Sequence, residues 1–520
     1  MEYLRLVQLE LTSWARVRRL NTRWLKEQID KLSGSYAHFM GVKELTPPSG
    51  AIQTKQLPGG VISVSPMFAR LAGTRSFRRL RSINQLLFLD VLYPGSGYRR
   101  ELHSYRAYTY CVDLLGRLTR VPRFRFLFDH RLARQALALA LLHDINHFPL
   151  LHVFQEVDPD YLTQLDLLDL FCDGEATQDS PSIYEILSDI GLSREQFRDV
   201  LLLKHADLVN NDYAPGLQIA KSLIDSGADI DKLAYLTDDS LHTGVAYGRG
   251  IDVTRLMASA TVAEVPAACP GKSGWHLAFS EGGMSAVESL VLARYWMFRT
   301  VYWHWVSRAV TAMLLHVIRK LYVEGKADLE DFVRETMWQP EEFVLRYLDD
   351  KFVSRFPGQH SITKDILRSP DTIYQRLLNL QGVSSNHVEV SLYQGLTNLD
   401  GAKLEACRLA LTDRLQEYLQ PARIEVSEHD VLIDIPRRRL DTGGPIHLVL
   451  DTGEVRMVEE IPGPLQRIAA DLDRLAKRVR VFVKPELVRA LGPDSLAARR
   501  PVLLGLLSES IPGTRITQVR

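Results

Sequence analysis

A histidine–aspartate pair ends the most apolar segment of the sequence. Residues 131–147, RLARQALALALLHDINH, are mostly Ala and Leu until His143 and Asp144, and His147 and His152 follow at short intervals. An imidazole and a carboxylate at the end of a buried helix must be compensated for the loss of solvent. A hydrogen-bonded pair with a purely structural role is therefore one interpretation. It is the stronger one for an isolated His-Asp pair, which is short and common by chance.

Two further residues favour a chemical role. His103 lies in RRELHSYRAYTY and Asp231 lies in GADIDKLAYLTDD, so residues of ligand type occur in the order His, His-Asp, Asp. Two imidazoles and two carboxylates suit a divalent transition metal that keeps one or two positions open for water. Such a metal lowers the pKa of bound water, which is the chemistry of a metal-dependent hydrolase. Spacing alone leaves open whether the four side chains converge.

The elements that must position these residues are mainly helical. Residues 1 to about 45 have the pattern of an amphipathic helix, which the Pro and Gly clusters at 46–50 and 57–60 end. From about 61 to 320 the apolar residues recur at helical spacing. Within that stretch, residues 284–323 predict one long helix or two.

The pattern changes after about residue 420. Residues 424–436 and 446–461 alternate like strands, and DTGE inside the second segment predicts a hairpin turn. A helix at 465–479 and a strand at 478–483 are predicted to follow. The sequence therefore predicts a mainly α fold, an all-helical core with a smaller C-terminal α+β lobe. The predicted parts are a helical segment at 1–60, the core at 61–330, a helical extension at 331–420 and the lobe at 421–520.

Composition limits the class of protein. The chain has 520 residues, of which 46% are hydrophobic and 24% charged, which is typical of a globular protein of two to four domains. Lys+Arg and Asp+Glu are 63 each, so charge gives no support for nucleic acid as a partner. The four cysteines form no CxxC pair, which suits a reducing compartment. We find no signal-peptide core and no membrane span, and we expect a cytoplasmic protein.

Five stretches carry the candidate residues in a fixed order: SPMFARLAGTRSFRRLRSINQ (65–85), YPGSGYRRELHS (93–104), LLHDINHFPLLHVF (141–154), DIDKLAYLTDDSLHTGV (229–245) and ARYWMFRTVYWH (293–304). Together they resemble motifs of the HD superfamily of metal-dependent phosphohydrolases. The resemblance is greatest to its deoxynucleoside triphosphate triphosphohydrolases, which include the animal SAM-and-HD-domain enzyme and bacterial dGTPase-like enzymes. It covers about 61–320, and so identifies the predicted core as an HD domain. In the C-terminal lobe it is loose, through VRVFVKPEL (479–487).

The resemblance implies a metal site and a pair of catalytic histidines. The implied metal ligands are His103, His143, Asp144 and Asp231. The metal is divalent, with Mn, Fe, Zn and Mg equally open, and a second Mg is expected at the triphosphate. His147 and His152 would face the α-phosphate, where one protonates the leaving sugar oxygen and the other stabilises the phosphate charge.

The resemblance also implies a nucleotide-binding site. It assigns Arg100, Lys232, Arg294 and Tyr235 to the triphosphate, Gln85 and Asp239 to the sugar 3′-hydroxyl, Tyr302 to the sugar 2′ position, and Leu86 and His304 to the base. In the family, the position of Tyr302 crowds a 2′-hydroxyl and so selects deoxyribose. Each assignment has a structural alternative: Arg294 suits an ion pair about as well, and Tyr302 suits an aromatic core stripe.

The chain departs from the family at the general acid. The family has an acidic residue three positions after its last motif histidine, where this chain has Gln155, with Glu156 beside it. The family also has a further histidine on the next helix, but residues 160–200 contain none. These groups orient and charge the general acid. Either catalysis is weakened, or Glu156 or Asp179 substitutes.

Two other motifs also differ. Ala234 and Asp238 stand where the family has an acid and a basic residue, and a negative Asp238 near triphosphate is unfavourable unless it faces away. Gly73 and Arg78 stand where the animal enzyme has the residues that read a guanine activator, so no such activator is predicted.

The sequence therefore predicts an enzyme, a metal-dependent dNTP triphosphohydrolase that releases deoxynucleoside and tripolyphosphate. One alternative is an HD phosphohydrolase that acts on another nucleotide or phosphoester. A second is a weakly catalytic nucleotide-sensing module. The resemblance also implies a homo-oligomer.

Overall fold

The computed structural model describes residues 42, 53–58, 60–157, 167–173, 181–267, 269–324, 328–359, 361–368, 373–435, 444–462, 476–492 and 496–512. Nearly all of the helix predicted at 1–45 and of the one predicted at 465–479 lies outside these residues. Across the described ranges, no helix combines the length and the apolar character that crossing a membrane requires.

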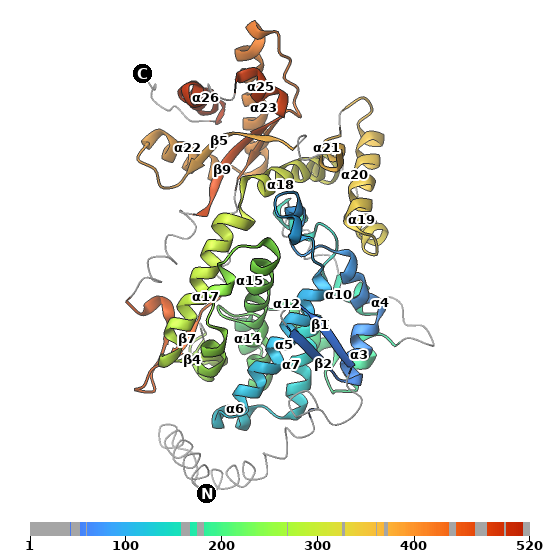
Figure 1. Ribbon diagram of the computed structural model, residues 1–520, viewed down its shortest axis with the longest axis vertical. Coiled ribbons are helices and arrows are strands. Elements are labelled where there is room, and N and C mark those ends of the chain that lie inside the picture. The colour runs from blue at the N-terminus through green and yellow to red at the C-terminus, as the bar shows by residue number, and fades with distance from the viewer. Residues whose placement is uncertain are drawn as a thin grey trace, which may run out of the picture.

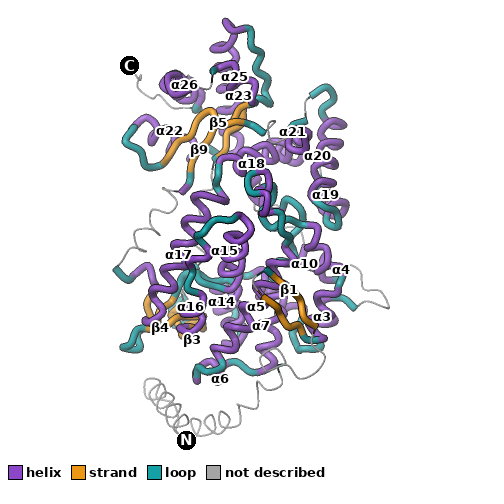
Figure 2. The backbone as a smooth tube through the Cα atoms, viewed as in Figure 1, coloured by secondary structure: helices purple, strands orange, loops and turns teal. Residues whose placement is uncertain are grey.

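The mainly α fold is confirmed, since helices dominate the chain and strands are few (Figure 2). The helices of the first part are α3 (Pro66–Gly73), α4 (Arg75–Arg78), α5 (Arg100–Leu118), α6 (Pro122–Leu127), α7 (His130–Leu142), α8 (Leu151–Val157), α10 (Leu167–Cys172), α11 (Ile183–Ser188), α12 (Arg194–Leu202), α13 (His205–Asn210), α14 (Pro215–Ile224), α15 (Ile230–Thr243), α16 (Val253–Ser259), α17 (Met284–Met297) and α18 (Trp305–Ile318). Those that follow are α19 (Leu329–Thr336), α20 (Glu341–Arg355), α21 (Thr363–Arg368), α22 (His387–Thr397), α23 (Gly401–Leu419), α25 (Pro485–Leu491) and α26 (Leu496–Ser510).

Three small sheets accompany the helices. Their strands are β1 (Gln53–Leu57), β2 (Gly60–Val64), β3 (Ala260–Pro266), β4 (Ser273–Ser280), β5 (Gln375–Gln381), β6 (Val431–Asp434), β7 (His447–Val449), β8 (Val455–Met457) and β9 (Arg478–Val483). They pair in the orders β1-β2, β3-β4-β7-β8 and β5-β9-β6. The predicted core thus contains the hairpin β3-β4, which we did not expect, and the hairpin β1-β2 forms where we predicted the end of the N-terminal helical segment and the start of the core. The Pro- and Gly-rich stretch at 265–274, which we interpreted as a plain loop, overlaps the strand ends and connects β3 to β4.

The predicted hairpin of residues 446–461 forms, but it joins the core. Strands β7 and β8 pair antiparallel around a turn in which Gly453 has a φ of 85°. Strand β7 also pairs in parallel with β4, with Ala278 opposite His447. The hairpin therefore lies beside β4, away from β5 and β9 (Figure 1). The C-terminal sheet in turn includes β5, which comes from the predicted helical extension. Strands from different predicted parts of the chain therefore pair in the same sheet.

Helix α7 forms for reasons that are local. Ala and Leu are strong helix formers, and the Asp129 side chain caps the helix by accepting from the Leu132 amide at 2.8 Å. Such a cap contributes about 1 kcal/mol. From Gln135 to Leu142 every residue of α7 is buried, and the helix contacts α5 and α14. The helix ends at His143, which places the His-Asp pair at the edge of the core.

The segment 284–323 forms two helices, α17 and α18. A π-helical turn, Phe298–Tyr302, ends the first, and Trp303 and His304 separate it from the second. The His304 side chain caps α18 by accepting from the Val306 amide at 3.4 Å. This break places Tyr302 at the end of a turn.

The described residues form three hydrophobic clusters. The first surrounds α5, α7, α14 and α15. The second combines residues 148–154 with α18, α19, α20 and two residues of the C-terminal strands, Leu432 and Phe482. The third lies between the β5-β9-β6 sheet and helices α22, α23 and α26. Helix α18 runs along this sheet and connects it to the rest of the molecule (Figure 1).

Candidate metal centre

Three helices bring His103, His143 and Asp231 together. His103 lies in the first turn of α5, His143 follows the last residue of α7, and Asp231 is the second residue of α15. The His103 Nε2 lies 2.9 Å from the Asp231 Oδ1 and 3.1 Å from the His143 Nε2. The His143 Nε2 lies 3.4 Å from the same carboxylate oxygen. Among the residues that the structure describes, these three form the group suited to hold a metal ion, with ligand atoms within 4.8 Å of one another.

Asp144 lies at the edge of this group. Its Oδ2 is 3.7 Å from the His103 Nε2, and its Oδ1 is 3.7 Å from the His143 Nε2. The Arg100 Nη1 donates to the Asp144 Oδ2 at 2.8 Å. The structure therefore brings all four predicted ligands together, with Asp144 shared between the cluster and Arg100.

The chemistry of these side chains fits a divalent metal ion. The His143 Nδ1 donates to the Ala140 carbonyl at 2.8 Å, so its Nε2 carries the lone pair that faces the cluster. His103 is 1% exposed. Burial lowers the pKa of His143, but the negative charges of Asp144 and Asp231 outweigh it and raise this pKa to about 9. Burial likewise raises the pKa of Asp231, but the two histidines outweigh it and bring it well below its usual value. Carboxylates this strongly attracted to positive charge suit a cation between them.

Arg100 connects the cluster to His152. The Arg100 Nη2 lies 3.0 Å from the His152 Nε2. A guanidinium only donates, so this Nε2 accepts, and the His152 Nδ1 carries the hydrogen that it donates to the Gln155 Oε1 at 3.0 Å. His152 has an exposed surface, but the surrounding protein and the charge of Arg100 lower its pKa, against the hydrogen bond to Gln155. His152 is therefore a neutral hydrogen-bond acceptor at neutral pH.

His147 lies between Asp144 and His152. Its Nδ1 is 3.2 Å from the Asp144 Oδ1, and its ring is 5.1 Å from that of His152. Burial and the charge of Arg100 bring the pKa of His147 well below its usual value. A bound polyphosphate would raise this pKa, because negative charge favours the protonated imidazole.

Two of the predicted sugar-binding residues, Asp239 and Tyr302, are hydrogen-bonded to each other. Both oxygens of Asp239 accept from phenols, one from the Tyr98 hydroxyl and the other from the Tyr302 hydroxyl at 2.5 Å. Burial raises the pKa of Asp239 to about 7, and the two phenols oppose that shift. The ring of Tyr235 lies 6.2 Å from that of Tyr302.

Lys232 is held by a carboxylate of its own helix. Its Nζ lies 2.7 Å from the Asp229 Oδ2, and its backbone amide donates to the Asp229 Oδ1 at 2.7 Å. Asp229 is thus both the cap of α15 and the partner of Lys232. Arg294 lies near enough for its charge to act on Tyr235 and Lys232. Two of the cations assigned to the triphosphate, Lys232 and Arg294, therefore lie close enough for their charges to act on each other.

Three predicted substrate residues have less defined surroundings. The Gln85 amide nitrogen of the backbone donates to the Tyr98 carbonyl at 2.9 Å, which brings Gln85 next to a residue that binds Asp239. Leu86 packs in the first hydrophobic cluster and His304 caps α18. The assignment of Leu86 and His304 to the base stays a prediction.

Comparison with known proteins gives three kinds of match. Residues 251–497 match the family described as the HD associated region. The chain is 30% identical over 315 residues to the uncharacterized protein YwfO of Bacillus subtilis, a match that covers 55% of this chain and 66% of that protein. It is 21% identical over 409 residues to the deoxynucleoside triphosphate triphosphohydrolase SAMHD1 of Mus musculus, covering 72% of this chain and 59% of that protein. These matches support assignment of the chain to the HD superfamily.

A solved structure supports the same fold. A hypothetical protein from Aquifex aeolicus aligns with a TM-score of 0.57 and 20% identity, covering 86% of this chain and 99% of that one. The chain thus shares the fold of that protein over most of its length. It spans about two thirds of YwfO and less of SAMHD1.

Proteins of the HD superfamily are generally dependent on a divalent metal, which agrees with the donor set of the cluster.

Two residues that hold this site in place were not indicated by the sequence. The Arg79 guanidinium donates to the Ile145 and His147 carbonyls, and it lies over the ring of Phe171 at 3.6 Å. Arg79 thereby fixes the turn between the metal ligands and His147. Tyr98 is the other, and only its place two residues before Arg100 could have suggested it.

Among the described residues, the His152 Nδ1 contacts an amide and not a carboxylate. Glu156, one of the two proposed substitutes, is bound by Arg308, with both pairs of nitrogen and oxygen atoms at 2.9 Å. The other, Asp179, lies outside the described residues. The neutral Gln155 is the residue that contacts the His152 Nδ1.

Asp238 does not oppose a polyphosphate. It is 1% exposed, and its Oδ1 accepts from the Arg106 Nε at 2.9 Å. Arg106 lies on α5 six residues beyond Arg100. The charge of Asp238 is therefore neutralised on the buried side of α15.

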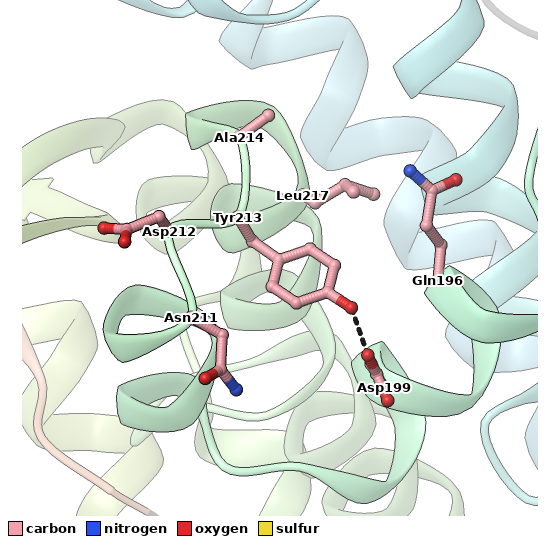
Figure 3. A pocket seen from close by; sticks show the side chains of 7 residues that line it. All are labelled: Gln196, Asp199, Asn211, Asp212, Tyr213, Ala214 and Leu217. Atoms are coloured by element: carbon pink, nitrogen blue, oxygen red, sulfur yellow. Dashed lines mark hydrogen bonds between the residues drawn. The ribbon is translucent and has the colours of Figure 1, made fainter.

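A separate pocket of about 490 Å³ lies between α12 and α14. Its lining residues are Gln196, Asp199, Asn211, Asp212, Tyr213, Ala214 and Leu217, and the Tyr213 hydroxyl donates to Asp199 (Figure 3). None of the residues assigned to metal or substrate lines it. The pocket offers two carboxylates and no cation, so it does not suit a nucleotide.

Proposed function

We propose that the protein is a metal-dependent dNTP triphosphohydrolase that cleaves a dNTP to deoxynucleoside and tripolyphosphate. One observation carries the proposal: two histidines and two aspartates from three helices converge beside Arg100 and two neutral histidines. The similarity to SAMHD1, whose name states this activity, supports the choice of substrate.

The metal would be held by His103, His143, Asp144 and Asp231. A divalent ion at that position supplies a water of lowered pKa and neutralises phosphate charge. Arg100, at 5% exposure, is positioned to stabilise negative charge that develops on the α-phosphate.

The two neutral histidines supply proton transfer. His147 lies beside Asp144, and a proton on its ring would be stabilised by that carboxylate once phosphate is bound. We assign His147 as the group that protonates the leaving sugar oxygen. His152, with its tautomer fixed by Gln155, hydrogen-bonds to phosphate and Arg100.

The sugar would bind against Asp239. With both oxygens bound to Tyr98 and Tyr302, this carboxyl is fixed in orientation and suits a hydroxyl. Tyr302 lies on the Asp239 side of the proposed sugar position, which supports selection of deoxyribose over ribose.

The homo-oligomer stays a prediction. Size-exclusion chromatography with light scattering tests it.

One observation favours a second candidate. His152 contacts the neutral Gln155 where the family has a carboxylate, so less negative charge is available to keep a proton on the pair of histidines. A general acid that is protonated to a smaller extent suits a substrate with a better leaving group, such as another nucleotide or phosphoester. It equally suits a nucleotide-sensing module with slow turnover.

Product analysis separates these candidates. The protein is incubated with each dNTP and NTP and with Mn²⁺, Mg²⁺ or Fe²⁺, and the products are resolved by ion-exchange chromatography. Tripolyphosphate and deoxynucleoside support the proposal, whereas orthophosphate or pyrophosphate favours the other phosphohydrolase. Tight binding without any product favours the sensing module. His143→Ala and Asp144→Ala are the controls, and activity that survives both rejects the site assignment.

A further inference from the structure

We propose that Arg308 is a positioning residue through which the C-terminal sheet holds His152 in place. The inference rests on the proposed function, because it gives the C-terminal lobe a part in that site. His152 and the metal ligands lie on segments that pack in different hydrophobic clusters, and Arg308 spans from the His152 helix to strand β6.

The metal ligands are supported by the first cluster. Helices α5, α7 and α15 all pack there, and the chain is still in this cluster at Ile145. From Phe148 onward the chain enters the second cluster, where Phe154 packs against Phe332 of α19 with ring centroids 4.7 Å apart. The segment that carries His152 therefore packs on α18, α19 and the C-terminal strands rather than in the cluster that supports the metal ligands.

The turn into α8 is conformationally demanding. Leu150, directly before α8, has a φ of 65°, which is the left-handed region that a leucine rarely adopts. Such a residue costs about 1 kcal/mol or more and persists only when its surroundings hold it. Helix α8 has seven residues, so it offers little of its own to hold this turn. An anchor at the far end of α8 is therefore needed.

Arg308 provides that anchor. Its Nη1 and Nη2 each donate to one oxygen of Glu156 at 2.9 Å, and Glu156 lies one helical turn after His152. Its Nε donates to the Asp434 Oδ2 at 3.1 Å, and its Nη2 also contacts Asp434. One planar guanidinium thus holds α8 with one edge and strand β6 with the other.

This anchor is buried and continues into the C-terminal sheet. Arg308 is 7% exposed and Asp434 is 1% exposed. On strand β9, the Arg480 Nη1 lies 3.7 Å from Asp434, and its Nη2 donates to the Trp303 carbonyl at 2.7 Å. The same network therefore reaches the segment between α17 and α18 that carries Tyr302.

Loss of the Arg308 contacts with Glu156 and Asp434 would displace His152 and leave the metal ligands in place. Lysine keeps the positive charge that Glu156 and Asp434 need, but it cannot bind both carboxylates in the plane of a guanidinium. Misplacement of a catalytic group by about 1 Å costs up to about a hundredfold in rate. Since Arg308 touches neither metal ligands nor phosphate, the loss should fall on kcat rather than on metal binding.

The test compares Arg308→Lys and Arg308→Met with a matched pair on α19. Arg334 binds Glu330 at an exposed site, so Arg334→Lys and Arg334→Met make the same substitutions in an arginine–glutamate pair away from His152. Three quantities are measured: hydrogen–deuterium exchange, Mn²⁺ affinity by calorimetry, and kcat and KM.

For Arg308→Lys we expect faster exchange in residues 148–157 and unchanged exchange in 100–118 and 230–243. We also expect Mn²⁺ affinity within twofold of the unsubstituted protein, KM within threefold, and kcat lowered at least tenfold. Adding Glu156→Gln to Arg308→Lys should lower kcat no further, because both changes break the same contact. The Arg334 variants should match the unsubstituted protein.

Unchanged exchange at 148–157 in a folded Arg308→Lys protein overturns the proposal. So does faster exchange spread equally over all three segments, or a loss of Mn²⁺ affinity as large as that of kcat. Exchange and Mn²⁺ binding require no turnover. If the unsubstituted protein hydrolyses no dNTP, the proposed function fails, while these two measurements still decide the role of Arg308.

Discussion

Arg100→Lys is the substitution whose effect can be worked out most fully. The guanidinium donates to the Asp144 Oδ2 at 2.8 Å and to the His152 Nε2 at 3.0 Å. A lysine ammonium is a single point charge and can keep only one of these contacts in this geometry. A hydrogen bond to a charged group contributes about 1.5–3 kcal/mol, which is roughly a 10- to 150-fold change in rate. We expect kcat/KM for the best dNTP to fall by about that factor.

The control lies on the same helix. Arg106 also forms a buried pair with an aspartate, Asp238, at 2.9 Å, but its contacts are with Asp238 and the Pro58 carbonyl rather than with Asp144 or His152. Arg106→Lys should cost similar stability in urea unfolding and should keep kcat/KM within about threefold. The assay is steady-state hydrolysis of the dNTP with Mn²⁺, with product separated by chromatography. Arg100→Lys activity within threefold of the unsubstituted protein, or an equal loss in Arg106→Lys, refutes the reasoning.

Three other outcomes are expected. Gln155→Glu places a carboxylate against the His152 Nδ1 and should raise the pKa of His152, followed by NMR of ¹⁵N-labelled histidine; an unchanged titration contradicts the hydrogen bond. Burial raises the pKa of Glu341 from 4.5 to about 8, against Arg100, so its contribution to stability is present below about pH 4.5 and is lost as pH rises through 8. Glu341→Gln should therefore increase the free energy of unfolding in urea more at pH 9 than at pH 5, and an equal change at both pH values contradicts this. Tyr302→Ala should raise the rate with NTPs relative to dNTPs, and an unchanged ratio removes Tyr302 from sugar selection.

Local patterns predicted the elements that depend on local physics. The Ala- and Leu-rich segment forms α7, and the DTGE turn forms the β7-β8 hairpin. What they could not predict is which distant segment a strand pairs with. The pairing of β7 with β4 depends on hydrogen bonds between residues far apart in the chain, and nothing in residues 446–461 identifies that partner.

The same limit applies to the site. Residue type and order nominated the ligands, but only the packing of α5, α7 and α15 brings His103, His143 and Asp231 together. Asp229 could have been found from sequence, since it occupies the cap position before α15. Arg308 could not, because its partners Glu156 and Asp434 come from distant segments that meet only in the fold. A residue such as Arg308, which supports the site from the second hydrophobic cluster, has no recognisable pattern in the sequence around it.

The most direct test of the central claim is anomalous X-ray diffraction from crystals grown with Mn²⁺. We predict an anomalous peak bounded by the Nε2 atoms of His103 and His143 and by the carboxylates of Asp144 and Asp231. The peak should be absent in His143→Ala crystals grown in the same way. A map without a peak between these four side chains, or with the Mn²⁺ peak elsewhere in the molecule, would contradict the account.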